Sequence, residues 1–312
     1  MEPQPRTARR LRRTGIALGA AAAAVIGVAA AAWFASPGVG DLQARVSRTA
    51  RSEGAAPVPL SSVAPIMRQA VVAAEDERFF RHHGIDTFGV MRAVAYDVTH
   101  LSLAEGASTI PEQLAKVLYL NGNDRSPWRK LVDAATAVRI SQRESKQEVL
   151  EAYLDLVYFG HGLYGIDAAA RGYFGVAPSS LTLSQASVLA GVIHAPTADD
   201  PLQHPLAARE RQAQVLRSMV INGFITQDEG DDVIAQPLAL VGGAVLPAMP
   251  GATVRPEAPV AGVPFTTGLI ALAVGLVAAI LMRRRDSALV RAVPKIAMIA
   301  GILVMARSLR AL

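Results

Sequence analysis

A short acidic segment interrupts an apolar stretch of the chain and offers a candidate general base. Residues 71–80 read Val-Val-Ala-Ala-Glu-Asp-Glu-Arg-Phe-Phe. In a helix, Glu75 lies one turn after Val71 and one turn before Phe79, so it shares a face with apolar side chains. A carboxylate in such surroundings is suited to take a proton from a substrate hydroxyl. An acidic turn in solvent is the plainer interpretation of the same residues.

Two adjacent histidines follow the acidic segment and directly precede Gly84. A helix that binds zinc commonly carries two histidines in the pattern His-Glu-x-x-His, and that spacing is missing here. We therefore interpret His82 and His83 as residues at a helix end, where the glycine closes the helix, and not as metal ligands.

A second segment, residues 106–116, has the composition of a site for a phosphate group. Its leading glycine allows a close approach of the backbone, and the hydroxyls of Ser108 and Thr109 can cap the helix that follows. Free amides at the start of that helix would face an anion. Lys116 lies a turn beyond Glu112 and could reach a phosphate from the same end. Thr109 and Glu112 also fit a capping box, which is a purely structural role.

A third segment packs three cations into six residues: Arg125, Arg129 and Lys130. Ser126 followed by Pro127 is typical of a helix start. In that helix Asp133 lies one turn after Arg129, so its carboxylate is expected beside both Arg129 and Lys130. The group is either an ordinary surface ion pair or part of a site for a metal ion and a pyrophosphate.

Taken in order, these segments resemble the motifs of the peptidoglycan glycosyltransferases, glycosyltransferase family 51. That family includes the transglycosylase domain of class A penicillin-binding proteins and the monofunctional peptidoglycan transglycosylases. The resemblance runs from about residue 63 to residue 225, and five motifs fall in register within it. They are carried by Glu75, Asp76, Phe79, His82 and Gly84; by Gly106, Ser108, Thr109, Ile110, Gln113 and Lys116; by Arg129 and Lys130; by residues 146–154; and by Arg211, Val215 and Leu216.

The resemblance implies a mainly α, lysozyme-like fold and a hexosyltransferase. The enzyme is expected to be monofunctional, because the sequence lacks the Ser-x-x-Lys and Lys-Thr-Gly elements of a penicillin-binding transpeptidase. Such an enzyme polymerises lipid II into β-1,4-linked glycan strands for the cell wall, by an inverting transfer that releases undecaprenyl pyrophosphate. Glu75 would take the proton from the acceptor's 4-hydroxyl as that oxygen attacks the anomeric carbon of the donor. The implied partners are lipid II, the lipid-linked nascent strand, the membrane bilayer and other proteins of cell-wall synthesis.

The resemblance also assigns the polar residues of the second and third segments to the substrate. Four cations would neutralise the pyrophosphate: Lys116, Arg125, Arg129 and Lys130. Three further side chains would position the sugar phosphate: Ser108, Thr109 and Gln113. Asp133 would complete the catalytic set and hold a divalent cation, Mg²⁺ or Mn²⁺.

The chain departs from the family's pattern at several positions. Asp133 stands where the family has a glutamate, and Glu112 replaces the first glutamine of the second motif. Asp155 stands where an asparagine is usual. Two alternatives to the polymerase therefore stay open. One is a catalytically weakened membrane scaffold of the cell-wall machinery, and the other is a glycan-cleaving enzyme, because paired carboxylates in a lysozyme-like cleft also suit hydrolysis.

The elements that must position these residues are predicted to be helices. Apolar residues recur three and four apart around 63–80, 114–120 and 181–193, and alternating strand patterns are scarce. This periodicity predicts a mainly α domain over residues 55–235. Residues 236–264 are rich in Pro, Gly and Ala with little charge, which favours an extended linker.

Two apolar stretches predict attachment to a membrane. Residues 14–34 carry no charge and are long enough to cross a hydrocarbon core of about 30 Å as a helix. We predict a basic cytoplasmic tail at 1–14 and an anchor at 15–35, with a cleavable signal peptide as the alternative. A second helix is predicted at 265–282, and 283–312 is predicted to be a basic cytoplasmic tail with an interfacial helix. The domain between the two helices would then face outward from the cytoplasmic membrane.

Composition excludes two other classes of function. The net charge is +5, but residues 1–14 contribute +4 and residues 283–312 contribute +6, so residues 15–282 carry −5. A domain with that charge is a poor nonspecific ligand for a polyanion, so no nucleic-acid partner is expected. The chain has no cysteine, which excludes disulfides, thiolate nucleophiles and cysteine-ligated metals.

Overall fold

The structure, a computed structural model, describes residues 6–89, 108–119 and 126–255. Within these residues helices dominate, and the strands form one two-stranded antiparallel sheet. The predicted mainly α class is therefore confirmed. The elements are α1 Arg6–Ala35, α2 Leu42–Glu53, η1 Leu60–Ser62, α3 Pro65–Glu75, η2 Phe79–Arg81, α5 Ile110–Tyr119, α6 Pro127–Arg143, α7 Lys146–Leu156, α8 Ile166–Phe174, η3 Pro178–Ser180, α9 Leu183–Val192, α10 Pro205–Ile221, α11 Gln227–Ala235, β1 Leu238–Ala239, η4 Val241–Gly243 and β2 Val245–Leu246.

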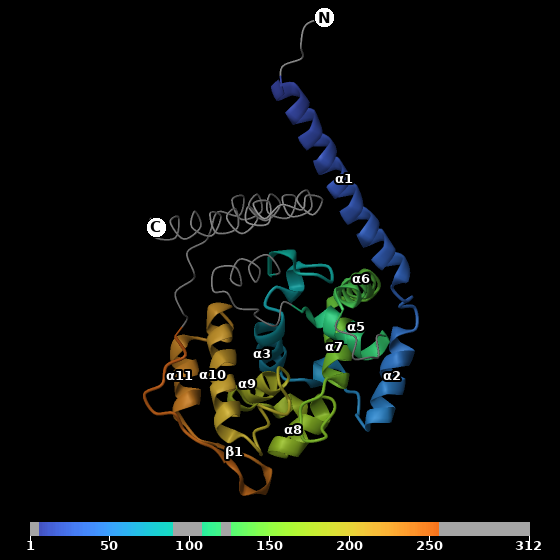
Figure 1. The fold of residues 1–312 in the computed structure, drawn as a ribbon. Coiled ribbons are helices and arrows are strands. Elements are labelled where there is room, and N and C mark those ends of the chain that lie inside the picture. Colours follow the sequence, from blue (N-terminus) through green and yellow to red (C-terminus); the bar gives the residue numbers. More distant parts are fainter. Residues whose placement is uncertain (1–5, 90–107, 120–125, 256–312) are drawn as a thin grey trace, which may run out of the picture. The chain divides into compact units, whose positions relative to one another are not determined.

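One large apolar core joins most of these helices. Helices α3, α9 and α10 pack against one another, and α5 packs against α6 and α7 (Figure 1). Helix α9 is buried from Ala186 to Val192, so it is covered on all sides by its neighbours. Each Leu or Met side chain that this core removes from water, such as Met67 on α3 and Leu114 on α5, contributes about 1.5–3 kcal/mol. The core therefore fixes α3 and α5, the two helices that carry the first two motifs.

Two segments outside the predicted domain limits of 55–235 also pack into the compact part of the chain. Helix α2 buries Leu42, Val46 and Ala50, which recur every four residues on one face. Strand β2, within the predicted linker 236–264, buries Leu246 in the same core. Val254 is fully buried beside α10 and α11. The compact unit thus includes residues on both sides of the predicted limits.

Helix α1 belongs, as far as Phe34, to a different unit from the compact part of the chain and is described by itself. It is helical over the predicted anchor at 15–35, and several of its large apolar side chains are exposed, among them Ile26 and Phe34. No helix within 6–89, 108–119 and 126–255 is both long and apolar enough to cross a membrane. The predicted segments 265–282 and 283–312 lie outside the described residues. The membrane segments therefore stay predictions.

Two carboxylates of α7 hold the segment that leads into α3. The Asp155 side chain accepts a hydrogen bond from the Val58 amide at 2.9 Å, and the Glu151 side chain accepts one from the Leu60 amide at 2.7 Å. Asp155 is only 5% exposed. Burial raises the pKa of Asp155 to about 6, and the nearby Glu151 carboxylate adds to the rise.

This pKa predicts a pH-dependent stability. Because the pKa of Asp155 is higher in the folded protein than in the unfolded chain, its protonated side chain stabilises the fold. This contribution is complete below the unfolded pKa of 3.8 and is lost as the pH rises through about 6. Asp155→Asn keeps an acceptor for the Val58 amide but carries no charge. We expect it to raise the free energy of unfolding by about 2 kcal/mol at pH 7.5 and by nearly nothing at pH 3.5. Urea unfolding at the two pH values measures this difference.

The control is Asp232→Asn, which removes the same charge from an exposed position on α11. Its effect should be small and equal at both pH values. If Asp155→Asn gave the same change at pH 3.5 as at pH 7.5, the burial of a charged Asp155 would not be the cause.

Candidate active site

Glu75 occupies the last position of α3. The predicted helix was expected to continue through Phe79, and that expectation is wrong, because the backbone leaves the helical conformation at Asp76. The reason is a set of hydrogen bonds outside the helix: the Asp76 carboxylate turns towards His82 and the amide of Ile110. Glu75 therefore projects from a helix end, while Phe79 lies fully buried in the turn that follows.

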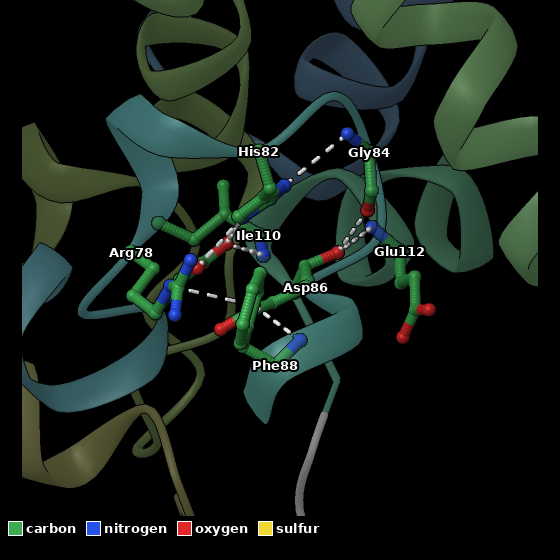
Figure 2. A network of polar contacts seen from close by, with 9 residues as sticks. Arg78, His82, Gly84, Asp86, Phe88, Ile110 and Glu112 are labelled. Atoms are coloured by element: carbon green, nitrogen blue, oxygen red, sulfur yellow. Dashed lines mark hydrogen bonds and ion pairs between the residues drawn. The ribbon is translucent and has the colours of Figure 1, made fainter. Parts of the chain in front are cut away.

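Asp76 is the centre of a buried polar network. Its carboxylate bonds His82 Nε2 at 2.8 Å and accepts from the Ile110 amide at 3.0 Å. The Gly84 amide donates to His82 Nδ1 at 3.2 Å, so the proton of the ring lies on Nε2, facing Asp76. Figure 2 shows His82 facing the Gly84 amide, with Ile110 nearby. His82 lies at the end of η2, as the sequence predicted, and with an exposure of 7% it is also a buried member of this network.

Gly84 lets the network pack against α6. Its φ is +103°, and an added Cβ would lie 2.7 Å from the Val138 backbone. Only glycine satisfies both conditions. The Gly84 carbonyl also accepts a hydrogen bond from the Thr109 hydroxyl at 2.6 Å, which fixes the start of α5 beside the same turn.

At the start of α5, two of the backbone amides that the sequence suggested for an anion already have acceptors within the protein. The Ile110 amide is occupied by the chain's own Asp76 carboxylate. Thr109 caps the helix, since its hydroxyl accepts from the Glu112 amide at 3.3 Å. The Glu112 side chain does not complete a capping box and instead bonds Lys130 at 3.2 Å. A carboxylate of the protein thus takes the place at this helix end that was expected for a phosphate.

Lys130, on α6, joins the second and third motifs. Its ammonium donates to the Ser108 hydroxyl at 2.5 Å and to the Glu112 carboxylate. The Glu112 side chain is 5% exposed and that of Lys130 is 56% exposed. Burial raises the pKa of Glu112, and the Lys130 ammonium opposes this rise. Lys130 is therefore a surface cation paired with the buried Glu112 carboxylate.

Glu75 contacts α5 through Gln113. The Gln113 amide nitrogen donates to Glu75 Oε2 at 2.7 Å, and the Gln113 amide oxygen accepts from the Tyr153 hydroxyl at 2.9 Å. The other carboxylate oxygen, Glu75 Oε1, is buried and has no hydrogen-bond partner among the residues that the structure describes. Because Gln113 and Glu112 are neighbours, one run of polar contacts leads from Glu75 to Lys130.

Arg129 and Asp133 form the ion pair expected from their spacing. Arg129 Nε lies 3.0 Å from Asp133 Oδ1, and both side chains are mostly buried. Arg129 also donates its amide to Ser126, so the predicted helix start at Pro127 is confirmed. Within the described ranges, no group of three or more His, Asp or Glu side chains is arranged to hold a metal ion. Asp133 is a single carboxylate that already binds Arg129, a donor set that does not by itself fit Mg²⁺ or Mn²⁺.

The geometry agrees with what comparison with known proteins shows. A protein-family model described as Transglycosylase matches residues 42–220. The chain belongs to the transglycosylase family. A putative transglycosylase of Cupriavidus necator is 42% identical over 185 residues, which cover 59% of this chain and 78% of that protein.

Larger members of the transglycosylase family match over the same part of the chain. Penicillin-binding protein 2D of Bacillus subtilis is 40% identical over 182 residues, which cover 58% of this chain and 26% of that protein. Penicillin-binding protein 1A of Escherichia coli is 40% identical over 175 residues, covering 56% of this chain and 20% of that protein. The chain thus spans about a quarter or less of these two relatives.

Three sets of contacts link residues of the predicted site in the structure. Glu75 contacts Gln113, Ser108 and Glu112 contact Lys130, and Arg129 contacts Asp133. Lys116 is exposed on α5 and makes no hydrogen bond or ion pair with any residue of the described ranges. Arg125 lies outside them. These assignments to the substrate stay predictions.

Two residues near the site lie in the motif at residues 146–154 but were given no role of their own from the sequence. The Tyr153 hydroxyl bonds Gln113. Lys146 places its ammonium 4.3 Å from the centre of the Phe79 ring. Burial lowers the pKa of Lys146, and the Asp76 carboxylate opposes this. The signal that could have revealed Tyr153 is its hydroxyl, because a tyrosine buried inside a helical core needs a polar partner.

Proposed function

We propose that this chain is a peptidoglycan glycosyltransferase, which joins lipid II into β-1,4-linked glycan strands. The proposal rests on the hydrogen bonding of Glu75, which lies in a transglycosylase motif. One of its oxygens is held by Gln113, and the other is buried without a partner among the described residues. A buried acceptor with a free lone pair is what a general base needs to receive a hydroxyl proton.

In the proposed reaction Glu75 Oε1 takes the proton from the 4-hydroxyl of the acceptor sugar. The oxygen so released forms a bond to the anomeric carbon of the lipid-linked strand. The bond from that carbon to the pyrophosphate oxygen breaks, and its electron pair stays on that oxygen, so the pyrophosphate leaves still attached to its lipid. Attack opposite to the leaving group inverts the anomeric centre and gives the β linkage.

The departing pyrophosphate needs positive charge, and this chain offers it on α5 and α6. Lys116 and Lys130 are exposed cations on these two helices, and Arg129 lies at the start of α6. Fixed cations stabilise the charge that develops on the leaving group without further reorganisation. Mg²⁺ or Mn²⁺ stays a prediction, and we derive no step from it, because Asp133 alone does not form a metal site.

We further propose a lysozyme-like arrangement of the domain and attachment to the cytoplasmic membrane. The uncharged stretch at 14–34, which is helical in α1, and the exposed side chains Ile26 and Phe34 support the membrane attachment. Both substrates carry lipid anchors, so an anchored enzyme would meet them at the bilayer surface. The extracytoplasmic position of the domain follows from the arginines ahead of this stretch.

The experiment that tests the proposal is polymerisation of purified lipid II by the full chain in detergent or liposomes, with the products separated by size. We expect strands many disaccharides long. Shortening of preformed strands would indicate a glycan-cleaving enzyme instead. If the chain neither lengthened nor shortened glycan, the scaffold alternative would be the remaining explanation, and the proposed function would be wrong.

Glu112→Gln tests the proposed use of Lys130. The Glu112 carboxylate is a fixed counterion for Lys130 and competes with a substrate pyrophosphate for its charge. Replacing it with the neutral isostere should lower KM for lipid II by about fivefold, the equivalent of about 1 kcal/mol, since the Lys130 side chain is half exposed and the pair is screened. Initial rates over a range of lipid II concentrations measure KM.

Glu144→Gln serves as the control, because Glu144 pairs with Arg143 at the far end of α6. KM should not change in that variant. An unchanged KM in Glu112→Gln as well would show that Lys130 does not bind the pyrophosphate.

A further inference from the structure

A chain of hydrogen bonds connects the core of the domain to the proposed base. It starts at Tyr153, in the last turn of α7, which is 2% exposed. The Tyr153 hydroxyl donates to Gln113 Oε1 at 2.9 Å, and Gln113 Nε2 donates to Glu75 Oε2 at 2.7 Å. Tyr153, Gln113 and Glu75 come from three helices, α7, α5 and α3, which the apolar core holds together.

Only one donor-to-acceptor direction along these hydrogen bonds suits an ionised Glu75. A carboxylate only accepts hydrogen bonds, so the amide must turn its nitrogen towards Glu75. The amide oxygen then faces Tyr153, whose hydroxyl must donate. Burial, and after it the carboxylates of Glu75 and Asp76, raise the pKa of Tyr153 well above its ordinary value, so the hydroxyl keeps the proton that it donates.

We propose that Tyr153 is a positioning residue, which acts through the amide of Gln113 to leave Glu75 Oε1 as the oxygen that takes the substrate's proton. This inference rests on the proposed function. Without the hydroxyl, Glu75 alone orients the Gln113 amide, and the buried amide oxygen loses its donor. An amide that turns over to find another donor places its oxygen against the Glu75 carboxylate and repels it, so Glu75 moves from the position in which it can act as a base.

The inference gives Gln113 a different role from the one that the family resemblance implied. Gln113 was expected to position the sugar phosphate. In the structure its amide oxygen and amide nitrogen are both engaged, one with Tyr153 and one with Glu75. A residue that holds the base should affect kcat, whereas one that binds the substrate's phosphate should affect KM.

The first test is Tyr153→Phe in the full chain, with kcat and KM measured in the lipid II assay. We expect kcat to fall by about 10- to 100-fold, because a small displacement of a catalytic group has effects of that order, while KM stays within about twofold. Tyr173→Phe is the matched control. Tyr173 is fully buried on α8, and its hydroxyl donates to the Phe159 carbonyl at 2.9 Å, so this variant loses a buried tyrosine hydroxyl away from Glu75 and should keep kcat.

A double-mutant cycle separates positioning from loss of structure. In a Gln113→Ala background, Tyr153 has no amide to orient, so adding Tyr153→Phe should change kcat by less than about twofold. An equal loss of kcat with and without Gln113 would overturn the inference. So would a Tyr153→Phe enzyme with the wild-type kcat.

Two further results keep the test decisive. If Tyr153→Phe fails to fold, Gln113→Leu replaces it in the kinetic assay. A lower kcat at unchanged KM supports the inference, and a raised KM at unchanged kcat contradicts it. If the wild-type chain makes no glycan at all, the proposed function itself is wrong, and the inference falls with it. A polymerising wild type with an equally active Tyr153→Phe variant contradicts the inference alone.

Discussion

Glu75→Gln is expected to reduce the rate of lipid II polymerisation by about 1000-fold, within the range that general base catalysis contributes. Glutamine has the size of glutamate and can still contact Gln113, but its amide cannot take the proton of the attacking hydroxyl. The loss should fall on kcat, because no contact with the bound substrate is assigned to Glu75 other than the one to the reacting hydroxyl. Product length and initial rate in the lipid II assay measure it.

Glu210→Gln is the matched control for this variant. It makes the same change of charge at an exposed position of α10, and its rate should equal that of the wild type. Urea unfolding of both variants shows whether either loses stability. A Glu75→Gln enzyme that kept a tenth or more of the wild-type rate would exclude Glu75 as the base.

Asp76→Ala is expected to lower the free energy of unfolding by about 3–5 kcal/mol, because two buried donors lose their charged acceptor and each such hydrogen bond contributes about 1.5–3 kcal/mol. The substitution leaves His82 Nε2 and the Ile110 amide without their acceptor in a buried position. It also releases the turn that ends α3, so Glu75 should lose its contact with Gln113. The midpoint and slope of urea unfolding give the free energy.

Asp76→Asn is the conservative comparison, because asparagine can still accept from the Ile110 amide. Its cost should be roughly half of that for Asp76→Ala. The exposed Asp232→Ala should change stability by less than about 0.5 kcal/mol. If Asp76→Ala were as mild as Asp232→Ala, the network around Asp76 would not be what fixes the end of α3.

The sequence predicted well what depends on neighbours along the chain. Ser126 caps α6, and Arg129 pairs with Asp133, since residues four apart meet on any helix. The apolar periodicity gave the mainly α class for the same reason. Thr109 was rightly identified as a cap of the helix after it.

What the sequence did not reveal depends on contacts between distant segments. Lys130 was expected beside Asp133, but it bonds Glu112, 18 residues earlier, and Ser108, 22 residues earlier. The end of α3 at Glu75 is set by Ile110, 34 residues beyond Asp76. No local pattern encodes these distances, because they are fixed only when the helices pack.

The packing of residues 244–254 matters to anyone who prepares the isolated domain for crystallisation. Leu246 and Val254 are both fully buried, and the Val254 amide donates to Asp231 of α11 at 2.7 Å. A truncation after residue 235, where the helical pattern stops, would remove these contacts and expose apolar side chains of α10 and α11 to solvent. The expressed fragment should therefore run at least to residue 255.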